Sequence, residues 1–262
     1  MKKIAVISGA SSGIGLSAAA MFYNNGYVVY SLSRAKPEDN RILHIPTDVS
    51  NAQSVKDAVE AVITSEGRID VLVNNAGFGI SGPVELTDLS DAKSIFDVNF
   101  FGTFLCIKYA LPYMRAQGYG HIVCVSSIAA VLPVPYQSFY SCTKSAINAF
   151  VLSLANEVRP FGIKVSAVMP GDVKTGFTSN RKKSVSDNEN YRAHEQRAIN
   201  RMEQDEQNGM SPEKVARRIF KAATKKRPRV IYAVGFSYRL FAVLQKILPA
   251  GFVNYIEGKI YG

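Results

Sequence analysis

Short apolar segments alternate with amphipathic helical patterns along most of this 262-residue chain, and this alternation restricts the fold more than any other feature. Strands are expected at 4–7, 27–33, 43–47, 71–73, 121–125, 164–168 and 230–234, with helical patterns between them. Strands that alternate with helices pair in parallel and are covered on both faces. The sequence therefore predicts an α/β class protein, a doubly wound Rossmann fold with a parallel sheet of about seven strands.

The loop after the first strand has the composition of a phosphate-binding turn. Strand, glycine loop and helix is the context in which backbone N–H groups and a helix N-terminus hold a pyrophosphate. A glycine turn can also be only a tight connection, but its position at the first strand–helix junction favours a cofactor. The predicted contacts are Gly9, Ser11, Ser12, Gly13, Ile14 and Gly15.

The end of the second predicted strand bears on which dinucleotide would bind. A site that prefers NAD places an acid about 20 residues after the glycines, to hold the ribose hydroxyls. Here Ser33 and Arg34 stand at that point, and the next acid is Glu38. Arg34 can donate forked hydrogen bonds to a 2′-phosphate, or it can be an exposed loop arginine. We favour NADP(H) over NAD(H).

Polar and small residues follow the later strands, at the edge where ligands of parallel sheets bind. Asp48 can accept a hydrogen bond from an adenine amino group, and Asp48 or Ser50 can also cap the next helix, expected at 52–65. The small residues allow a ligand to approach the backbone closely. The further candidates for cofactor binding are Asp48, Val49, Asn75, Ala76, Gly77, Pro170, Gly171, Val173 and Thr175.

A tyrosine and a lysine four residues apart provide a candidate for proton transfer. On a helix Tyr140 and Lys144 share one face. A cation about 5 Å away, at an effective dielectric of about 20, lowers a phenol pKa by about two units. Such pairs are frequent by chance, so the neighbouring features decide. Ser127 ends the preceding strand, and Asn99 interrupts the apolar pattern of a long helix expected at about 91–116.

Taken together, these residues make the chain resemble the short-chain dehydrogenase/reductase family, of its ordinary soluble type. The resemblance runs from about residue 4 to 175, continues through the helix after Ser211 and the last strand, and stops before the tail. It implies that Asn99, Ser127, Tyr140 and Lys144 are catalytic. The family's serine lies 13 positions before its tyrosine, and 140 − 127 = 13 selects Ser127 over Ser126.

The resemblance implies hydride transfer between a nicotinamide and a carbonyl or alcohol carbon. Tyr140 would exchange a proton with the substrate oxygen, and Ser127 would polarise that oxygen. Lys144 would lower the pKa of Tyr140 and bind the nicotinamide ribose, as Tyr140 itself would contact the cofactor. Asn99 would position a water that links Lys144 to solvent. The residues implied to fix the carboxamide are Val173 and Thr175.

Two regions bear on the substrate. The polar segment at about 176–210, in which Tyr191, Ala198 and Met202 suggest an amphipathic helix, could be a lid or a solvated surface helix. The aromatic and basic tail at about 236–262 could line an apolar pocket, pack against a second subunit or lie on a membrane surface. Segment 97–178 is similar to family members that act on steroids and lipid alcohols. We expect a hydrophobic, steroid-like alcohol or ketone.

The charge balance, +10 from 31 Lys and Arg against 21 Asp and Glu, suits an anionic cofactor. No nucleic-acid motif accompanies it, so no nucleic acid is expected. Three cysteines without metal-like spacing, no signal peptide and no run of 18 apolar residues predict a cytoplasmic protein with one domain over 1–262. The resemblance also implies that the protein forms a homodimer or a homotetramer. The alternatives to an enzyme are a regulatory protein that binds the cofactor and a membrane-surface protein.

Overall fold

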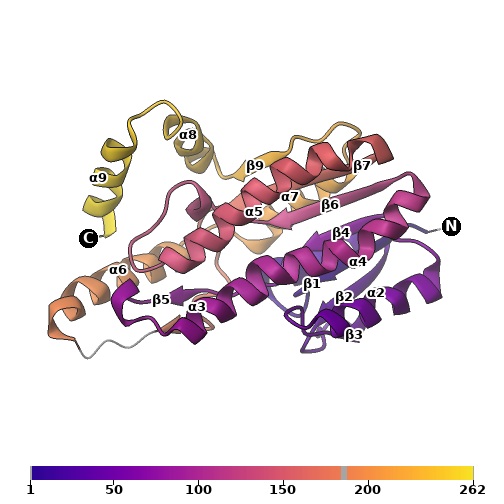
Figure 1. The fold of residues 1–262 in the computed structure, drawn as a ribbon, viewed down its shortest axis with the longest axis horizontal. Helices are drawn as coiled ribbons and strands as arrows, with labels where there is room; N and C mark the ends of the chain where they lie inside the picture. Colours follow the sequence, from indigo (N-terminus) through magenta and orange to yellow (C-terminus); the bar gives the residue numbers. More distant parts are fainter. Residues whose placement is uncertain (1, 184–187, 262) are drawn as a thin grey trace.

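The structure is a computed structural model and describes residues 2–183 and 188–261 (Figure 1). Its main sheet contains seven strands that pair in parallel, which confirms the predicted fold class. They are β1 (Ile4–Ser8), β2 (Val28–Ser33), β3 (Leu43–Pro46), β4 (Val71–Asn74), β6 (Gly120–Val125), β7 (Ile163–Pro170) and β9 (Ile231–Val234). The order β3-β2-β1-β4-β6-β7-β9 runs outward from β1 in both directions, so the sheet is doubly wound.

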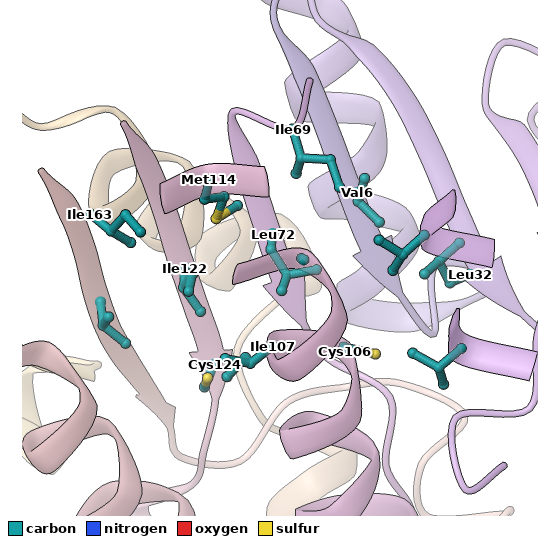
Figure 2. Packing of buried hydrophobic residues seen from close by; sticks show 14 of the residues in the cluster. Val6, Leu32, Ile69, Leu72, Cys106, Ile107, Met114, Ile122, Cys124 and Ile163 are labelled. Atoms are coloured by element: carbon teal, nitrogen blue, oxygen red, sulfur yellow. The ribbon is translucent and has the colours of Figure 1, made fainter. Parts of the chain in front are cut away.

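Both faces of the sheet are covered by helices because every central strand is apolar on both sides. In β1, Ile4 and Val6 belong to one buried cluster, while Ala5 and Ile7 belong to the other. This is the period-two alternation of a strand. The first cluster includes side chains of α2 (Ala52–Glu66), α4 (Gly102–Gln117) and α5 (Ser138–Glu157), and Figure 2 shows its packing against the strands. The second includes α1 (Gly13–Asn24) and α7 (Pro212–Thr224).

The long helix expected at 91–116 is present but interrupted. It consists of α3 (Leu89–Phe96), a π-helical segment (Asp97–Phe101) and α4, and the π segment coincides with Asn99. Within the described residues, Leu89–Gln117 is the stretch long and apolar enough to cross a membrane. Its α4 portion, however, buries Cys106, Ile107 and Met114 in the first cluster (Figure 2). These contacts are those of a core helix in a sheet-based fold.

The predicted cap of α2 was wrong. Asn51 is the N-cap, and its Oδ1 accepts a hydrogen bond from the backbone N of Ser54 at 2.9 Å. Asp48 instead accepts from both the backbone N and the Oγ of Ser50, at 3.0 and 2.7 Å. The sequence carries three residues of capping type within four positions, Asp48, Ser50 and Asn51, and only the backbone geometry selects among them.

The segment after β7 forms a wall at one end of the molecule. A short strand β8 (Lys182–Lys183) pairs in parallel with β5 (Ile80–Ser81), and α6 (Glu189–Gln207) follows in the described chain. The tail forms two helices, α8 (Phe236–Leu244) and α9 (Ala250–Tyr261), and α9 lies at the same end as α6 (Figure 1). The buried face of α6 carries Ala198 and Met202, as the sequence predicted, and packs against Tyr261 of α9. Short 3-10 turns occupy Val84–Leu86, Ile128–Ala130 and Arg159–Phe161.

Candidate active site

A cavity of about 850 Å³ lies at the carboxyl ends of the parallel strands. It brings together almost all of the residues that the sequence singled out, from segments far apart in the chain. The predicted residues that line it are Gly9, Ser11, Ser12, Gly13, Ile14, Arg34, Asp48, Val49, Asn75, Ala76, Gly77, Ser127, Tyr140, Lys144, Pro170, Gly171, Val173 and Thr175. Gly15 and Asn99 do not line it.

The glycine loop has the conformation of a close-approach turn. Gly9 and Gly13 have φ values of +66° and +54°, which L side chains rarely adopt. A Cβ on Gly9 would stand 2.8 Å from the Cα of Ala76, and one on Gly15 would stand 2.2 Å from the carbonyl oxygen of Gly9. Gly9 therefore lets the loop meet the end of β4. Gly15 lets α1 pack against the loop, which explains why Gly15 is absent from the cavity wall.

Ser8 and Asn75 hold this loop to the neighbouring strand. The Ser8 Oγ accepts hydrogen bonds from the backbone N of Asn75 and of Ala76, at 3.0 and 3.1 Å. The Asn75 Nδ2 donates to the carbonyl oxygens of Ser8 and Gly9, at 3.2 and 3.0 Å. The sequence did not predict Ser8 as part of the site. The structure makes Ser8 the clamp that joins the ends of β1 and β4.

The loop and the start of α1 offer donors to an anionic group. Ser12 is the N-cap of α1, and its side chain makes no capping hydrogen bond. Gly13 and Ile14, at the first turn, line the cavity. Free backbone N–H groups and the positive end of the helix dipole favour a phosphate at such a place. The cradle therefore fits the pyrophosphate of a dinucleotide.

Two charged residues line the end of the cavity that lies away from Tyr140. Arg34 is exposed and lines the cavity, as does Asp48. The Ser50 hydroxyl and backbone N–H, and the charge of Arg34, lower the pKa of the Asp48 carboxyl. The Ser33 Oγ donates to the carbonyl oxygen of Ala35 at 2.8 Å, so that hydroxyl is used locally. Arg34 is left as the charged donor at this end.

Tyr140, Lys144 and Ser127 converge at the opposite end. Withdrawal from water raises the pKa of the Tyr140 phenol to about 12, while a hydrogen bond with Ser127 lowers it. The net shift is upward, so the lowered pKa that the sequence predicted for Tyr140 is not found. The Lys144 Nζ lies 5.6 Å from the Tyr140 ring centroid and donates to the carbonyl oxygen of Val125 at 2.9 Å. The ammonium therefore lies over the ring, and its hydrogen bond goes to the backbone of β6. Burial lowers the pKa of Lys144 itself to about 8.

Asn99 supports this group from behind the cavity wall. Its Oδ1 accepts from the backbone N of Phe78 at 3.0 Å, and its Nδ2 donates to Phe78 O at 3.0 Å and Thr143 Oγ1 at 3.2 Å. A Cβ on Gly77 would stand 2.9 Å from the Asn99 Oδ1. The side chain thus joins the loop after β4 to the helix that carries Tyr140. Its implied role toward a water remains a prediction.

Several cavity residues were not selected from the sequence because they come from segments without a recognisable motif. The Phe177 ring lies 5.5 Å from the Tyr140 ring, centroid to centroid. The tail, which could have lined a pocket, packed on a subunit or lain on a membrane, does line this cavity. Its contributions, signalled in the sequence only by its aromatic composition, are Tyr238, Phe241, Glu257, Ile260 and Tyr261.

The compartment beside Tyr140 is mainly apolar but contains carboxyl groups. Asp172, Glu206 and Glu257 line it, and burial raises the pKa of each. Glu206 forms an ion pair with the buried Arg181 and accepts from the hydroxyl of Thr178. The cavity thus has an exposed cation, Arg34, beside Asp48 at one end, and three carboxyl groups with raised pKa values at the other.

This geometry suits a nicotinamide dinucleotide and a carbonyl compound, and comparison with known proteins agrees. A profile of the family described as short chain dehydrogenase matches residues 3–186. The chain belongs to that family. This short-chain dehydrogenase is 42% identical to a 3-ketodihydrosphingosine reductase of Bacteroides thetaiotaomicron over 97% of this chain and 96% of the relative.

Solved structures with the same fold cover most of the chain. A short-chain dehydrogenase from Streptomyces avermitilis superposes with a TM-score of 0.85 at 29% identity, covering 99% of this chain and 96% of that one. ElxO with NADP bound has a TM-score of 0.77 at 28% identity, with coverages of 92% and 100%. A 3-ketoacyl-(acyl-carrier-protein) reductase from Brucella melitensis complexed with NADH has a TM-score of 0.75 at 25% identity, with coverages of 88% and 96%. Structural neighbours of this short-chain dehydrogenase thus carry either dinucleotide.

Proposed function

We propose that this short-chain dehydrogenase uses NADP(H) to reduce the ketone of a long-chain amphiphile, and that its substrate class is the 3-keto amino lipid. The observation that carries the proposal is the compartment beside Tyr140, where a proton-donating phenol meets apolar tail residues and carboxyl groups in one cavity. The name of the Bacteroides relative supports a ketone of this kind. The hydrophobic, steroid-like substrate expected from the sequence is the second candidate, supported by the same apolar wall.

The side chains present can perform the proton half of this reaction. A dinucleotide, held by the glycine loop, Arg34 and the segment after β7, would supply the hydride. Tyr140, whose raised pKa keeps it protonated at neutral pH, donates a proton to the developing alkoxide. Ser127 donates a hydrogen bond to the same oxygen and stabilises its charge. The buried Lys144 ammonium adds a positive field on the far side of the phenol.

The choice of NADP(H) rests on Arg34. It lines the cavity at the end away from Tyr140, and no acid lines that part of the wall except Asp48. A guanidinium binds a 2′-phosphate through charge-assisted hydrogen bonds. A site for the diol of NAD would be better served by a carboxylate at the end of β2.

The carboxyl groups favour an amine on the substrate. A protonated amine next to the reacting ketone would lie within the field of Asp172, Glu206 and Glu257, which line the same compartment. Arg181 neutralises part of this charge through its ion pair with Glu206. A simple steroid or fatty ketone has no group that would be attracted by the remaining carboxyls.

Fluorescence titration with NADPH and NADH, combined with a ketone panel, tests the proposal. The panel comprises 3-ketodihydrosphingosine, the same chain without the amine, a 3-ketosteroid and a short water-soluble ketone, each with wild type and Tyr140→Phe. The expected result is NADPH-preferring binding by both proteins, turnover by wild type alone, and the highest kcat/KM with the amino ketone. Preference for the amine-free chain or the steroid would contradict the substrate class. Tight cofactor binding without turnover on any ketone would favour a regulatory protein.

A further inference from the structure

The outer face of the tail is an exposed apolar surface. Of the eighteen large apolar side chains that are exposed in the described residues, ten lie between residues 236 and 260. Phe236 and Ile247 are 85% and 75% exposed. We define the tail face by these ten: Phe236, Leu240, Phe241, Val243, Ile247, Leu248, Phe252, Tyr255, Ile256 and Ile260. An exposed apolar surface of this extent on a soluble domain marks an interaction site.

The spacing of these residues follows the two helices. In α8 they fall at positions 236, 240, 241 and 243, and in α9 at 252, 255, 256 and 260. Positions 236, 240 and 243, and all four positions in α9, have the intervals of one helical stripe, whereas Phe241 lies beside the stripe and lines the cavity. The opposite sides of the helices are already used: Tyr238 bonds to Asp172, and Tyr261 packs on α6. The tail is therefore fixed to the body by one side and leaves the other side uncovered.

The charges around the tail face select its partner. Arg239, Lys246 and Lys259 are exposed on the two helices and their connection, whereas the single acid of the tail, Glu257, lines the cavity. Two copies of this face would bring like charges together, which disfavours a second copy of the chain as the partner. An anionic lipid surface supplies both the apolar interior and the negative headgroups that such a face requires.

The tail face is also continuous with the cavity. Phe241 and Ile260 line the cavity and are nevertheless 47% and 46% exposed, so each side chain contributes to both surfaces. We propose that α8 and α9 dock on an anionic lipid bilayer and that an apolar ketone enters the cavity from the bilayer between them. The docking rests on the surface alone; the entry route rests on the function proposed above.

Sedimentation of the full chain with vesicles tests the docking without substrate or cofactor. Wild type is expected to sediment with phosphatidylcholine vesicles containing phosphatidylglycerol, and more weakly with phosphatidylcholine alone. Phe236→Ser combined with Ile247→Ser removes two exposed side chains that do not line the cavity, and should weaken vesicle partitioning on the order of tenfold or more. The matched control, Leu89→Ser with Leu152→Ser, removes similar exposed groups outside the tail and should leave partitioning unchanged.

A second pair of variants tests the charge. Lys246→Glu with Lys259→Glu should abolish the preference for anionic vesicles, whereas Lys225→Glu with Lys226→Glu, which alters exposed lysines before β9, should preserve it. Failure of wild type to sediment, or equal binding by the tail variants, would overturn the docking. Light scattering that shows a dimer dissociated by the same tail substitutions would assign the face to a second copy instead.

Turnover separates the docking from the proposed reaction. Both tail variants should reduce the short water-soluble ketone within twofold of wild type, because neither touches the cavity. With a long-chain ketone embedded in anionic vesicles, the Ser variant should lose on the order of tenfold in rate. Vesicle binding without turnover of any ketone would leave the docking intact and refute the function. Equal rates of wild type and variant on embedded ketone would refute the entry route.

Discussion

The hydroxyl of Tyr238 in α8 donates a hydrogen bond to the carboxylate of Asp172, beyond the end of β7. The ring of Tyr238 also lies directly on Gly171: a Cβ there would stand 2.2 Å from the ring carbon Cε2. Two residues 66 positions apart thus fasten the tail to the loop that lines the cavity beside Tyr140. The tail is for this reason part of the wall of the site.

Tyr238→Phe is expected to loosen the tail. The substitution keeps the ring on Gly171 and removes the hydroxyl, which donates to the carboxylate of Asp172 and accepts from the backbone N of Asp172 at 3.3 Å. The hydrogen bond to the carboxylate contributes about 1.5–3 kcal/mol where the charged group is buried, and less at this partly exposed position. Hydrogen exchange should show faster amide exchange in α8 and α9 with little change in β1 or β6. Tyr255→Phe, which changes a 62% exposed phenol, is the matched control. Equal protection in the two variants would contradict the role of the hydrogen bond.

The fold and the inner part of the site were predictable because both depend on local patterns. Apolar runs alternating with helices define the sheet, and the carboxyl ends of parallel strands meet at one edge. Gly9, Ser127 and Tyr140 could therefore be placed near one another without a structure. The position of Lys144 on the face of Tyr140 followed from helical spacing, but the pKa of the phenol did not. Burial decides that pKa, and it depends on long-range packing such as the contact with Phe177, which the sequence does not place.

Gly15→Ala is expected to destabilise the protein and weaken dinucleotide binding. The added Cβ would stand 2.2 Å from the backbone oxygen of Gly9, which cannot yield as a flexible side chain would. Overpacking of this kind costs about 1–3 kcal/mol. Gly258→Ala is the control, because nothing lies within 4 Å of its added Cβ in α9. Chemical denaturation should separate the two, with Gly258→Ala unchanged or slightly more stable.

Arg34→Ser tests the choice of cofactor. If Arg34 binds a 2′-phosphate, the substitution removes charge-assisted hydrogen bonds of about 1.5–3 kcal/mol, which is about 10- to 150-fold in the affinity for NADPH. The affinity for NADH should change by less than threefold. Arg41→Ser, a nearby exposed arginine paired with Asp39, is the control. A parallel loss of affinity for both dinucleotides would instead indicate a contact with the adenine or the shared phosphates.

The outer part of the site lay beyond sequence reasoning for a physical reason. Asn99 could be recognised as unusual in an apolar helix, but the π-helical segment and the bonds to Phe78 and Thr143 depend on three separate segments. Likewise, Asn51 rather than Asp48 caps α2 because backbone angles, which neighbouring contacts fix, choose among adjacent polar residues. Long-range contacts decide these details, and composition alone does not reveal them.

His121 should make the stability of the fold depend on pH. It is buried in β6, and burial lowers its pKa from 6.5 to about 4. The unfolded chain therefore binds a proton between pH 6.5 and 4 that the folded chain does not. The stabilisation is fully present above pH 6.5 and is lost as the pH falls to 4, by up to about 3 kcal/mol. Urea denaturation should show that the free energy of unfolding depends less on pH in His121→Phe than in wild type. The same pH dependence in both proteins would contradict the role of His121.

Lys144 should set the upper pH limit of ketone reduction. Burial lowers its pKa to about 8, whereas the pKa of Tyr140 is raised to about 12. As the pH rises through 8, Lys144 loses its proton and its field, while Tyr140 remains protonated and able to donate. The kcat/KM for reduction should therefore fall above pH 8 by about tenfold per pH unit, approaching the level of an enzyme without that charge.

The pH profile of kcat/KM is measured with a short water-soluble ketone, so that tail docking does not contribute. Lys144→Met should be slower and flat between pH 7 and 9. A wild-type rate that stays constant to pH 10, or a break near pH 8 that survives in Lys144→Met, would assign the control of proton transfer to another group.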